Sequence, residues 1–266
     1  MKVLIVGEFS AFAKNLSVGI NSIDGNEAVV FANDDGFKKI KQTSLSYTYK
    51  SPHNIKLFGF EIRGTHKIVG YFQYMKFKKD LKKFKNYFDV IFIISYTLIR
   101  EEHNKTNPQF SINDLKYAIK KDGKIFMSSC GGDVAFFEFA KQNKRFSCVY
   151  KDLNIPRMPL YYKQKDLIKD IVKGVIPMSY QYHEAYRLYG KEFPLLNPIQ
   201  LPFDVSTVPH KSEYLKNKKI TIFNGALRPT KGTKFIVEAL QKISEKYSDR
   251  IIIREDRLPY NQFLNF

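Results

Sequence analysis

The sequence contains no tryptophan and only two cysteines, Cys130 and Cys148. Two cysteines cannot form the disulfide framework of a small secreted domain, and no residues have the spacing of metal ligands. We therefore expect no metal ion, no cofactor and a reducing compartment. Long apolar stretches are also absent, because none approaches the roughly 20 residues that cross a bilayer.

The N-terminal segment, MKVLIVGEFSAFA, superficially resembles a signal peptide, since Lys2 is followed by an apolar run. Glu8 interrupts that run before it reaches the length of a signal-peptide core. We therefore expect a cytoplasmic protein, with peripheral attachment to the inner face of the cell membrane as an open alternative.

Positive charge dominates, because 44 lysines and arginines stand against 26 aspartates and glutamates, for a formal net charge of +18. Such a charge attracts polyanions, namely nucleic acid, an anionic membrane or a phosphorylated ligand. It is equally compatible with lysines that occupy exposed helix positions, so charge alone does not identify the partner. Hydrophobic residues make up 44% of the chain and aromatic residues 15%, which suffices for a packed core.

The apolar runs have the pattern of an α/β protein with a parallel sheet. Short, continuously apolar segments alternate with amphipathic ones, and glycine-containing turns lie between them. The predicted strands of the first part are Lys2–Val6, Glu27–Ala32, Asp89–Ser95, Lys124–Ser128 and Val175–Met178. The predicted helices are Phe12–Ile23, Lys76–Phe88, Ile112–Lys120, one from about Leu167 and Tyr180–Tyr189. Asp122 and Gly123 are expected to form a turn.

A proline-rich segment separates two parts of this pattern. Four prolines lie within the 17 residues from Phe193 to Pro209, which favours an extended linker over a helix or a central strand. We therefore predict a complete Rossmann-like domain at residues 1–196, a linker at 197–216 and a second Rossmann-like domain beginning at 217. After the linker the sequence predicts the strand Lys219–Phe223, the helix Thr233–Tyr247 and the strand Arg250–Arg254.

This second part, residues 217–266, is expected to be incomplete. Two strands and one helix do not close a Rossmann-like sheet, and so short a piece buries little surface alone. We therefore expect it to be the first part of a domain.

The strongest local signal is Asn224–Leu240, NGALRPTKGTKFIVEAL. A predicted strand ends before Gly225, a loop carries Arg228 and Lys231, and Thr233 opens an amphipathic helix. Free N–H groups at a helix N-terminus suit a phosphate, and Arg and Lys suit its remaining oxygens. An ordinary loop with two solvated cations fits the same spacing, so both interpretations stay open.

This segment resembles the start of the donor domain in GT-B glycosyltransferases, especially bacterial enzymes of capsule and cell-surface polysaccharide synthesis. The resemblance implies that the chain transfers a sugar from a nucleotide-diphosphate sugar to a lipid-linked or oligosaccharide acceptor. It also implies an acidic pair on a later helix, beyond Phe266, so the donor domain is expected to be truncated and activity incomplete. The residues implied to bind the donor diphosphate are Gly225, Arg228, Lys231, Gly232 and Thr233.

Acceptor-side loops are expected in the first domain. In the resembling enzymes the loop that here contains Gly7 and Ser10 faces the acceptor, although it lacks the dinucleotide pattern GxGxxG. A tight turn that only leads into the next helix fits the same residues. The turn Gly131-Gly132-Asp133 is similar to a Gly-x-Asp turn of the same enzymes. Asp133 is a candidate base for an acceptor hydroxyl and, alternatively, the N-cap of the next helix.

The helix Tyr180–Tyr189 combines tyrosines with polar tips and a histidine. Tyr182 and His183 are candidate contacts to an acceptor sugar. The same residues suit a helix that simply covers the sheet, and His183 is then structural.

Lys76–Phe88 contains six lysines and one aspartate, and Phe77, Leu81, Phe84 and Phe88 fall on one helical face. This pattern is typical of a helix on an anionic membrane surface. It is also typical of a helix docked on a sheet through its apolar stripe, which we favour because a buried strand follows.

Two further functions remain as alternatives. The chain could be a non-catalytic remnant of the same fold that binds a partner. A basic nucleic-acid-binding protein is the other alternative, but the lysines are scattered and no recognition motif is present, so we expect no nucleic acid among the partners.

Overall fold

The computed structural model describes residues 1–33, 40–41, 45–49, 53–101, 108–130, 133–142, 158–199, 220–223 and 233–254. The chain divides into two compact units, one of residues 1–136 and 157–203 and the other of residues 137–156 and 204–266. The linker predicted at 197–216 lies almost entirely outside the described residues. The domain boundaries taken from the sequence therefore stay a prediction.

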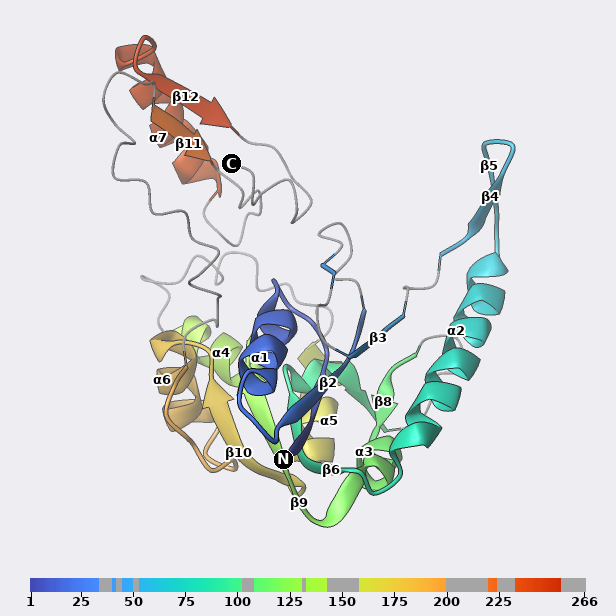
Figure 1. The fold of residues 1–266 in the computed structure, drawn as a ribbon. Coiled ribbons are helices and arrows are strands. Elements are labelled where there is room, and N and C mark those ends of the chain that lie inside the picture. Colours follow the sequence, from blue (N-terminus) through green and yellow to red (C-terminus); the bar gives the residue numbers. More distant parts are fainter. Residues whose placement is uncertain are drawn as a thin grey trace. The chain divides into compact units, whose positions relative to one another are not determined.

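A sheet of six parallel strands forms the centre of the first unit (Figure 1). Its strands are β1 (Lys2–Val6), β2 (Glu27–Asn33), β3 (Ser46–Tyr49), β6 (Phe88–Ile93), β9 (Ile119–Ser129) and β10 (Val172–Pro177). Across the sheet they stand in the order β3-β2-β1-β6-β9-β10. In chain order this is 3-2-1-4-5-6, the order of the doubly wound Rossmann fold. The predicted α/β class with a Rossmann-like parallel sheet is confirmed.

Helices and short paired strands complete this unit. The helices are α1 (Phe12–Asn21), α2 (Thr65–Leu81), α3 (Ile112–Ala118), α5 (Met158–Ile168) and α6 (Tyr180–Tyr189), with 3-10 turns η2 (Lys82–Phe84) and η3 (Tyr96–Leu98). The helix α4 (Val134–Gln142) begins in this unit, and its residues from Phe137 on are assigned to the second unit. The short strands are β4 (Ile55–Leu57) with β5 (Phe60–Ile62), and β7 (Ile99–Arg100) with β8 (Phe110–Ser111).

Side chains of the central strands alternate between two buried faces, as the pleat of a strand requires. Val3 and Ile5 of β1 belong to the cluster that packs around Phe12 of α1. Phe31 of β2 points to the opposite face, where its ring lies 6.1 Å from that of Phe77 and 5.8 Å from that of Phe84. Both faces are covered, which explains why the strands are apolar throughout rather than alternating.

The segment Lys76–Phe88 is docked on the sheet, as we favoured. Phe77, Leu81, Phe84 and Phe88 are all buried, so its apolar stripe is not available to a membrane. The helix boundaries differ from the prediction, because α2 begins at Thr65 and Phe88 already belongs to β6. The prediction began too late because the apolar stripe of the first half of α2 lies on another side of the helix.

The expected turn at Asp122 and Gly123 is also corrected. These residues lie within β9, where Phe88 pairs with Ile119 but Val90 pairs with Lys124. Between these two pairs β9 has more residues than β6, so the pairing register shifts, as at a β-bulge. The strand β9 continues through this shift.

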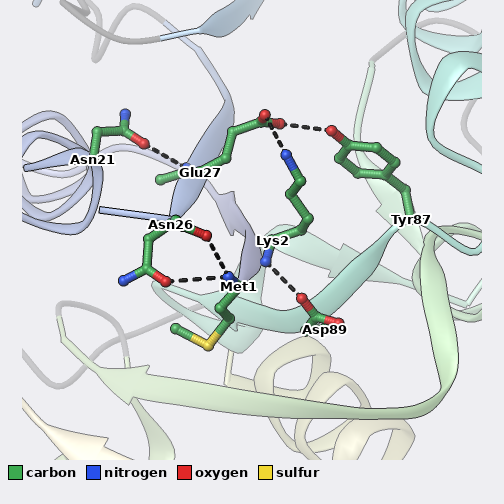
Figure 2. Close-up of polar contacts among 9 residues, drawn as sticks. Met1, Lys2, Asn21, Asn26, Glu27, Tyr87 and Asp89 are labelled. Atoms are coloured by element: carbon green, nitrogen blue, oxygen red, sulfur yellow. Dashed lines mark hydrogen bonds and ion pairs between the residues drawn. The ribbon is translucent and has the colours of Figure 1, made fainter. Parts of the chain in front are cut away.

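Polar contacts join the amino ends of the central strands (Figure 2). The Lys2 ammonium lies 2.6 Å from the Glu27 carboxylate, which also accepts a hydrogen bond of 2.8 Å from the Tyr87 hydroxyl. Asp89 accepts the Lys2 backbone N–H at 2.6 Å (Figure 2). It also pairs with the Lys120 ammonium at 2.7 Å. These contacts fix the amino edge of the sheet.

The second unit contains a strand–helix–strand element. β11 (Ile220–Phe223) and β12 (Ile251–Arg254) pair in parallel, and α7 (Thr233–Lys246) lies between them in sequence. This is the predicted restart of the Rossmann-like pattern, with the helix ending one residue before the predicted Tyr247.

Candidate functional site at the carboxyl edge of the sheet

The strand order defines where this fold places ligands. β1 and β6 are neighbours at the point where the order of the strands reverses, and open α/β sheets bind ligands outside the carboxyl ends of the strands at this point. Here those ends lead into Gly7 after β1 and into Ile94 and Ser95 after β6. The predicted acceptor-side residues Gly7 and Ser10 therefore lie in the loop at this edge.

Gly7 is required by geometry. Its backbone has φ of +98°, and a Cβ atom at this position would lie 2.1 Å from Cδ1 of Leu98. The chain then turns sharply, with Ser10 and Ala11 at φ of 53° and 66°, in the left-handed region that non-glycine residues seldom adopt. Such strain is concentrated at functional sites, which supports a role for this loop beyond connection.

Glu8 is a functional candidate that the sequence patterns did not identify. Its buried carboxylate accepts hydrogen bonds from the backbone N–H groups of Phe9 at 2.6 Å, Ala13 at 3.3 Å and Lys14 at 3.1 Å. The last two belong to the first turn of α1, so the protein's own carboxylate holds the helix N-terminus. Rossmann-type sites bind phosphate at this place. The sequence signal that could have identified Glu8 is an acidic residue just before a predicted helix.

The loop after β9 lies beside the end of β6. The Cys130 thiol donates to the backbone carbonyl of Ile94 at 3.2 Å, and burial raises the pKa of this thiol to about 12. Cys130 is only 3% exposed, so it serves as a packing group. Gly131 and Gly132 lie outside the described residues.

Asp133 has the alternative role that we predicted, that of an N-cap. One carboxylate oxygen accepts the backbone N–H of Phe136 in the first turn of α4 at 3.2 Å. The other accepts the hydroxyl of Tyr186, from α6, at 2.8 Å. Asp133 is only 2% exposed, and burial raises the pKa of its carboxyl group to about 6 despite these hydrogen bonds.

Tyr96 extends this network to the end of β6. Its hydroxyl accepts the backbone N–H of Val134 at 2.6 Å, and the ring is buried. Asp133, Tyr96 and Tyr186 thus join three consecutive strand ends, because α4 follows β9 and α6 follows β10. Neither tyrosine had been predicted as a site residue, since burial is not visible in an aromatic-rich sequence.

The candidate sugar contacts on α6 are partly occupied by protein neighbours. The Tyr182 ring lies 4.6 Å from the ring of Phe136, which brings it next to the Asp133 cap. His183 contacts Glu184 at 3.3 Å and stacks on Tyr180 with ring centroids 6.4 Å apart. Tyr180 is the exposed aromatic residue of this helix, at 70% exposure, although one face of its ring lies toward His183.

The donor side belongs to the second unit. Of the predicted diphosphate ligands, Thr233 is the first residue of α7. The others, Gly225, Arg228, Lys231 and Gly232, lie outside the described residues, between the end of β11 and the start of α7. The prediction that they bind a diphosphate therefore stands on the sequence and on the elements that flank the loop.

Within the described ranges, no three His, Cys, Asp or Glu side chains are arranged to hold a metal ion. None of the described helices combines the length and the apolar character needed to span a membrane.

The chain matches no known family model and no curated protein. Similar solved structures include a UDP-N-acetylglucosamine 2-epimerase, with 12% identity and a TM-score of 0.47 over 100% of this chain and 71% of that one. Another is the UDP-GlcNAc 2-epimerase from Methanocaldococcus jannaschii, with 12% identity and a TM-score of 0.40 over 99% of this chain and 67% of that one. Likeness at this level assigns no reaction.

Proposed function

We propose that the chain binds a nucleotide-diphosphate sugar and transfers the sugar to a hydroxyl group of a lipid-linked or oligosaccharide acceptor, as in surface polysaccharide synthesis. The observation that carries this proposal is the β11–α7–β12 element of the second unit. Parallel strands with an intervening helix also occur in the nucleotide-binding halves of Rossmann folds, which supports the proposal. Arg228 and Lys231 stand in the sequence before the helix.

The charge of these residues suits the chemistry. When the bond between the sugar and the diphosphate breaks, negative charge grows on the leaving phosphate oxygens. Arg228 can pair with two such oxygens through its planar guanidinium, and Lys231 supplies a mobile point charge. Donors directed at developing charge are among the largest contributions to catalysis.

The loop after β1 in the first domain is poorly suited to a nucleotide. Because Glu8 already holds the N-terminus of α1, a phosphate at that place would meet a carboxylate of like charge. The strained loop of Gly7 and Ser10 is thus better suited to an uncharged hydroxyl ligand than to a nucleotide. We therefore propose that the acceptor lies on this side and the donor in the second unit.

Asp133 is the candidate base that removes the proton from the acceptor hydroxyl. Its pKa lies near the value that a general base needs at neutral pH. Both of its oxygens, however, already accept hydrogen bonds from the protein. This supports the N-cap over catalysis, and Asp133 can act as a base only if Tyr186 moves away.

A screen of nucleotide sugars tests the proposal. The purified chain is incubated with UDP-, GDP- and CMP-sugars, and both binding and release of the nucleotide are measured. We expect UDP- or GDP-sugars to bind and to be hydrolysed slowly, so that water accepts the sugar in place of the acceptor hydroxyl and a nucleoside diphosphate is released. CMP-sugars, which have one phosphate, should bind more weakly.

The same screen, with duplex DNA added as a further ligand, separates the rival functions. Binding without release identifies a non-catalytic remnant of the fold. Conversion of the sugar while it stays attached to the nucleotide contradicts transfer and identifies an epimerase. Salt-sensitive binding of duplex DNA in place of any nucleotide sugar identifies the nucleic-acid-binding alternative.

A further inference from the structure

The hairpin β4–β5 exposes one entirely apolar face. Its register pairs Ile55 with Ile62 and Leu57 with Phe60, while Lys56 pairs with Glu61. Because side chains alternate along a strand, the four apolar residues share one face and the charged pair occupies the other. All four apolar side chains are exposed, Phe60 at 79%. A lone two-stranded hairpin has no core beneath such a face.

The tip of this hairpin presents another aromatic side chain. Phe58 and Gly59 form the turn with φ of +50° and +83°. Turns with two such residues favour Asn-Gly, because a bulky side chain in the left-handed region is strained. Phe58 nevertheless occupies the first position and is 91% exposed. A strained backbone that displays a phenyl ring to solvent points to a ligand for that ring.

The hairpin is attached to α2 through polar contacts at its base. Asn54 accepts the backbone N–H of His66 at 3.2 Å, in the first turn of α2, and its amide nitrogen donates to Glu61 at 2.6 Å. The Thr65 hydroxyl accepts the Ile55 N–H and donates to the carbonyl of Ile62, both at 2.7 Å. These bonds hold the hairpin at the end of α2 (Figure 1).

The first half of α2 carries a second exposed apolar surface. Ile68, Tyr71, Phe72 and Met75 are spaced by 3, 1 and 3 residues, so they form one stripe, and all are exposed, Phe72 at 66%. Phe77 begins the stripe that docks on the sheet. At 100° per residue, Phe77 lies about 180° around the helix from Ile68. The exposed stripe thus faces away from the side that packs.

We call residues 53–75, which comprise the hairpin and this half of α2, the apolar arm. Its surroundings are basic, since residues 53–79 contain six lysines and arginines and one acid, Glu61. Lys79 lies four residues after Met75, at the end of the stripe, and Lys76 is also exposed. An apolar stripe bordered by cations is the composition of elements that lie in the headgroup region of anionic bilayers.

We propose that the apolar arm inserts into the surface of an anionic lipid bilayer. Phe58, the apolar hairpin face and the stripe of α2 enter the boundary of the acyl chains, while the neighbouring lysines and Arg63 lie among the phosphates. A second copy of the chain is a poorer occupant, because it would bring two basic arms of two chains of charge +18 together. The inference does not depend on the reaction that the chain catalyses.

A single tryptophan tests insertion directly, because the chain has none of its own. In Phe58→Trp, emission should shift to the blue on addition of phosphatidylcholine vesicles containing phosphatidylglycerol, and brominated acyl chains should quench it. In the control Ile23→Trp, at a residue 59% exposed outside the arm, neither change is expected. An unshifted emission at position 58 overturns the proposal.

Vesicle sedimentation of the full chain provides the second measurement. Phe58→Ser combined with Phe60→Ser should lower partitioning into the anionic vesicles about tenfold or more, since each ring buried contributes on that scale. Ile23→Ser should stay within about twofold of the unmodified chain, and vesicles of phosphatidylcholine alone should bind more weakly. Equal binding by the double variant contradicts insertion. A shift at position 58 that depends on protein concentration without lipid identifies a second copy, and one caused by an acidic polypeptide identifies a protein partner.

Discussion

Two buried carboxylates organise the candidate site at the scale of single residues. Glu8 holds the start of α1 and Asp133 the start of α4, each through backbone N–H groups. Backbone donors at a helix start favour the charged carboxylate, whereas burial opposes it. For Asp133 burial is the larger effect, and the pKa is raised to about 6 from an ordinary value of 3.8.

This shift predicts a pH dependence of stability. Because the folded chain holds the Asp133 proton more tightly than the unfolded chain, the stabilising contribution is present below about pH 4 and is lost as pH rises through about 6. Asn cannot ionise and still caps a helix, so Asp133→Asn should escape this loss. The unfolding free energy of the variant minus that of the wild type should rise by up to about 3 kcal/mol across this interval. Urea denaturation at a series of pH values measures it, and a constant difference contradicts it.

The role of a single residue could be predicted where it depends on neighbours in the sequence, and not where it depends on residues distant in the sequence. The N-cap role of Asp133 was predictable, because a cap needs only the residue and the helix that follows. The partnership of Asp133 with Tyr186 joins residues 53 positions apart, and no local pattern contains it. Glu8 was noticed only as an interruption of an apolar run, although its position before a helix indicated a cap.

At the scale of elements, the turn after β1 is the most constrained part of the site. Gly7→Ala introduces a Cβ that would lie 2.1 Å from Leu98, at φ of +98°. We expect a loss of about 2–4 kcal/mol in unfolding free energy, from the strained backbone and the overpacking together.

Gly25 is the matched control for this substitution. Its φ is +78°, and nothing lies within 4 Å of the position that a Cβ atom would take, so only the cost of the backbone conformation remains. Gly25→Ala should cost about 1 kcal/mol. Equal losses for the two variants in chemical denaturation would show that contact with Leu98 does not constrain the turn.

The elements differed in how well the sequence predicted them. β1 was predicted with its observed bounds and β2 to within a residue, because a continuous apolar run flanked by a turn is a local signal. The start of α2 was wrong, because its apolar stripe changes sides between Met75 and Phe77 and no single helical face describes it. β3 was missed, since SYTY has no continuous apolar run.

At the scale of the whole molecule, different parts of the chain are suited to different ligands. The carboxyl edge of the sheet offers a strained loop whose anion position is already occupied by Glu8. The second unit offers a strand–loop–helix with two cations in its loop. The apolar arm offers an exposed aromatic tip bordered by lysines. Together, the three proposals describe an enzyme that is held at the membrane where its lipid-linked acceptor lies.

The parallel sheet was predictable from the sequence, whereas the exposed apolar arm was not. Buried parallel strands leave a compositional signature that survives without tertiary information. The sequence of the apolar arm does not distinguish it from a core segment. Whether its apolar residues are exposed or buried is decided by the fold and cannot be read from residue type. The family resemblance at Asn224–Leu240 supplied the donor assignment.

The proposed reaction depends on the loop with Arg228 and Lys231 binding the diphosphate of a nucleotide sugar, and calorimetric titration with UDP or GDP measures this binding. Each of Arg228→Ala and Lys231→Ala should weaken binding tenfold or more, about 1.4 kcal/mol, because each removes a charged partner of the phosphates. Lys242→Ala, the same charge change at an exposed position further along α7, should leave the affinity unchanged. Affinity that is equal in all three variants and the unmodified chain would contradict the assignment of the donor site to this loop.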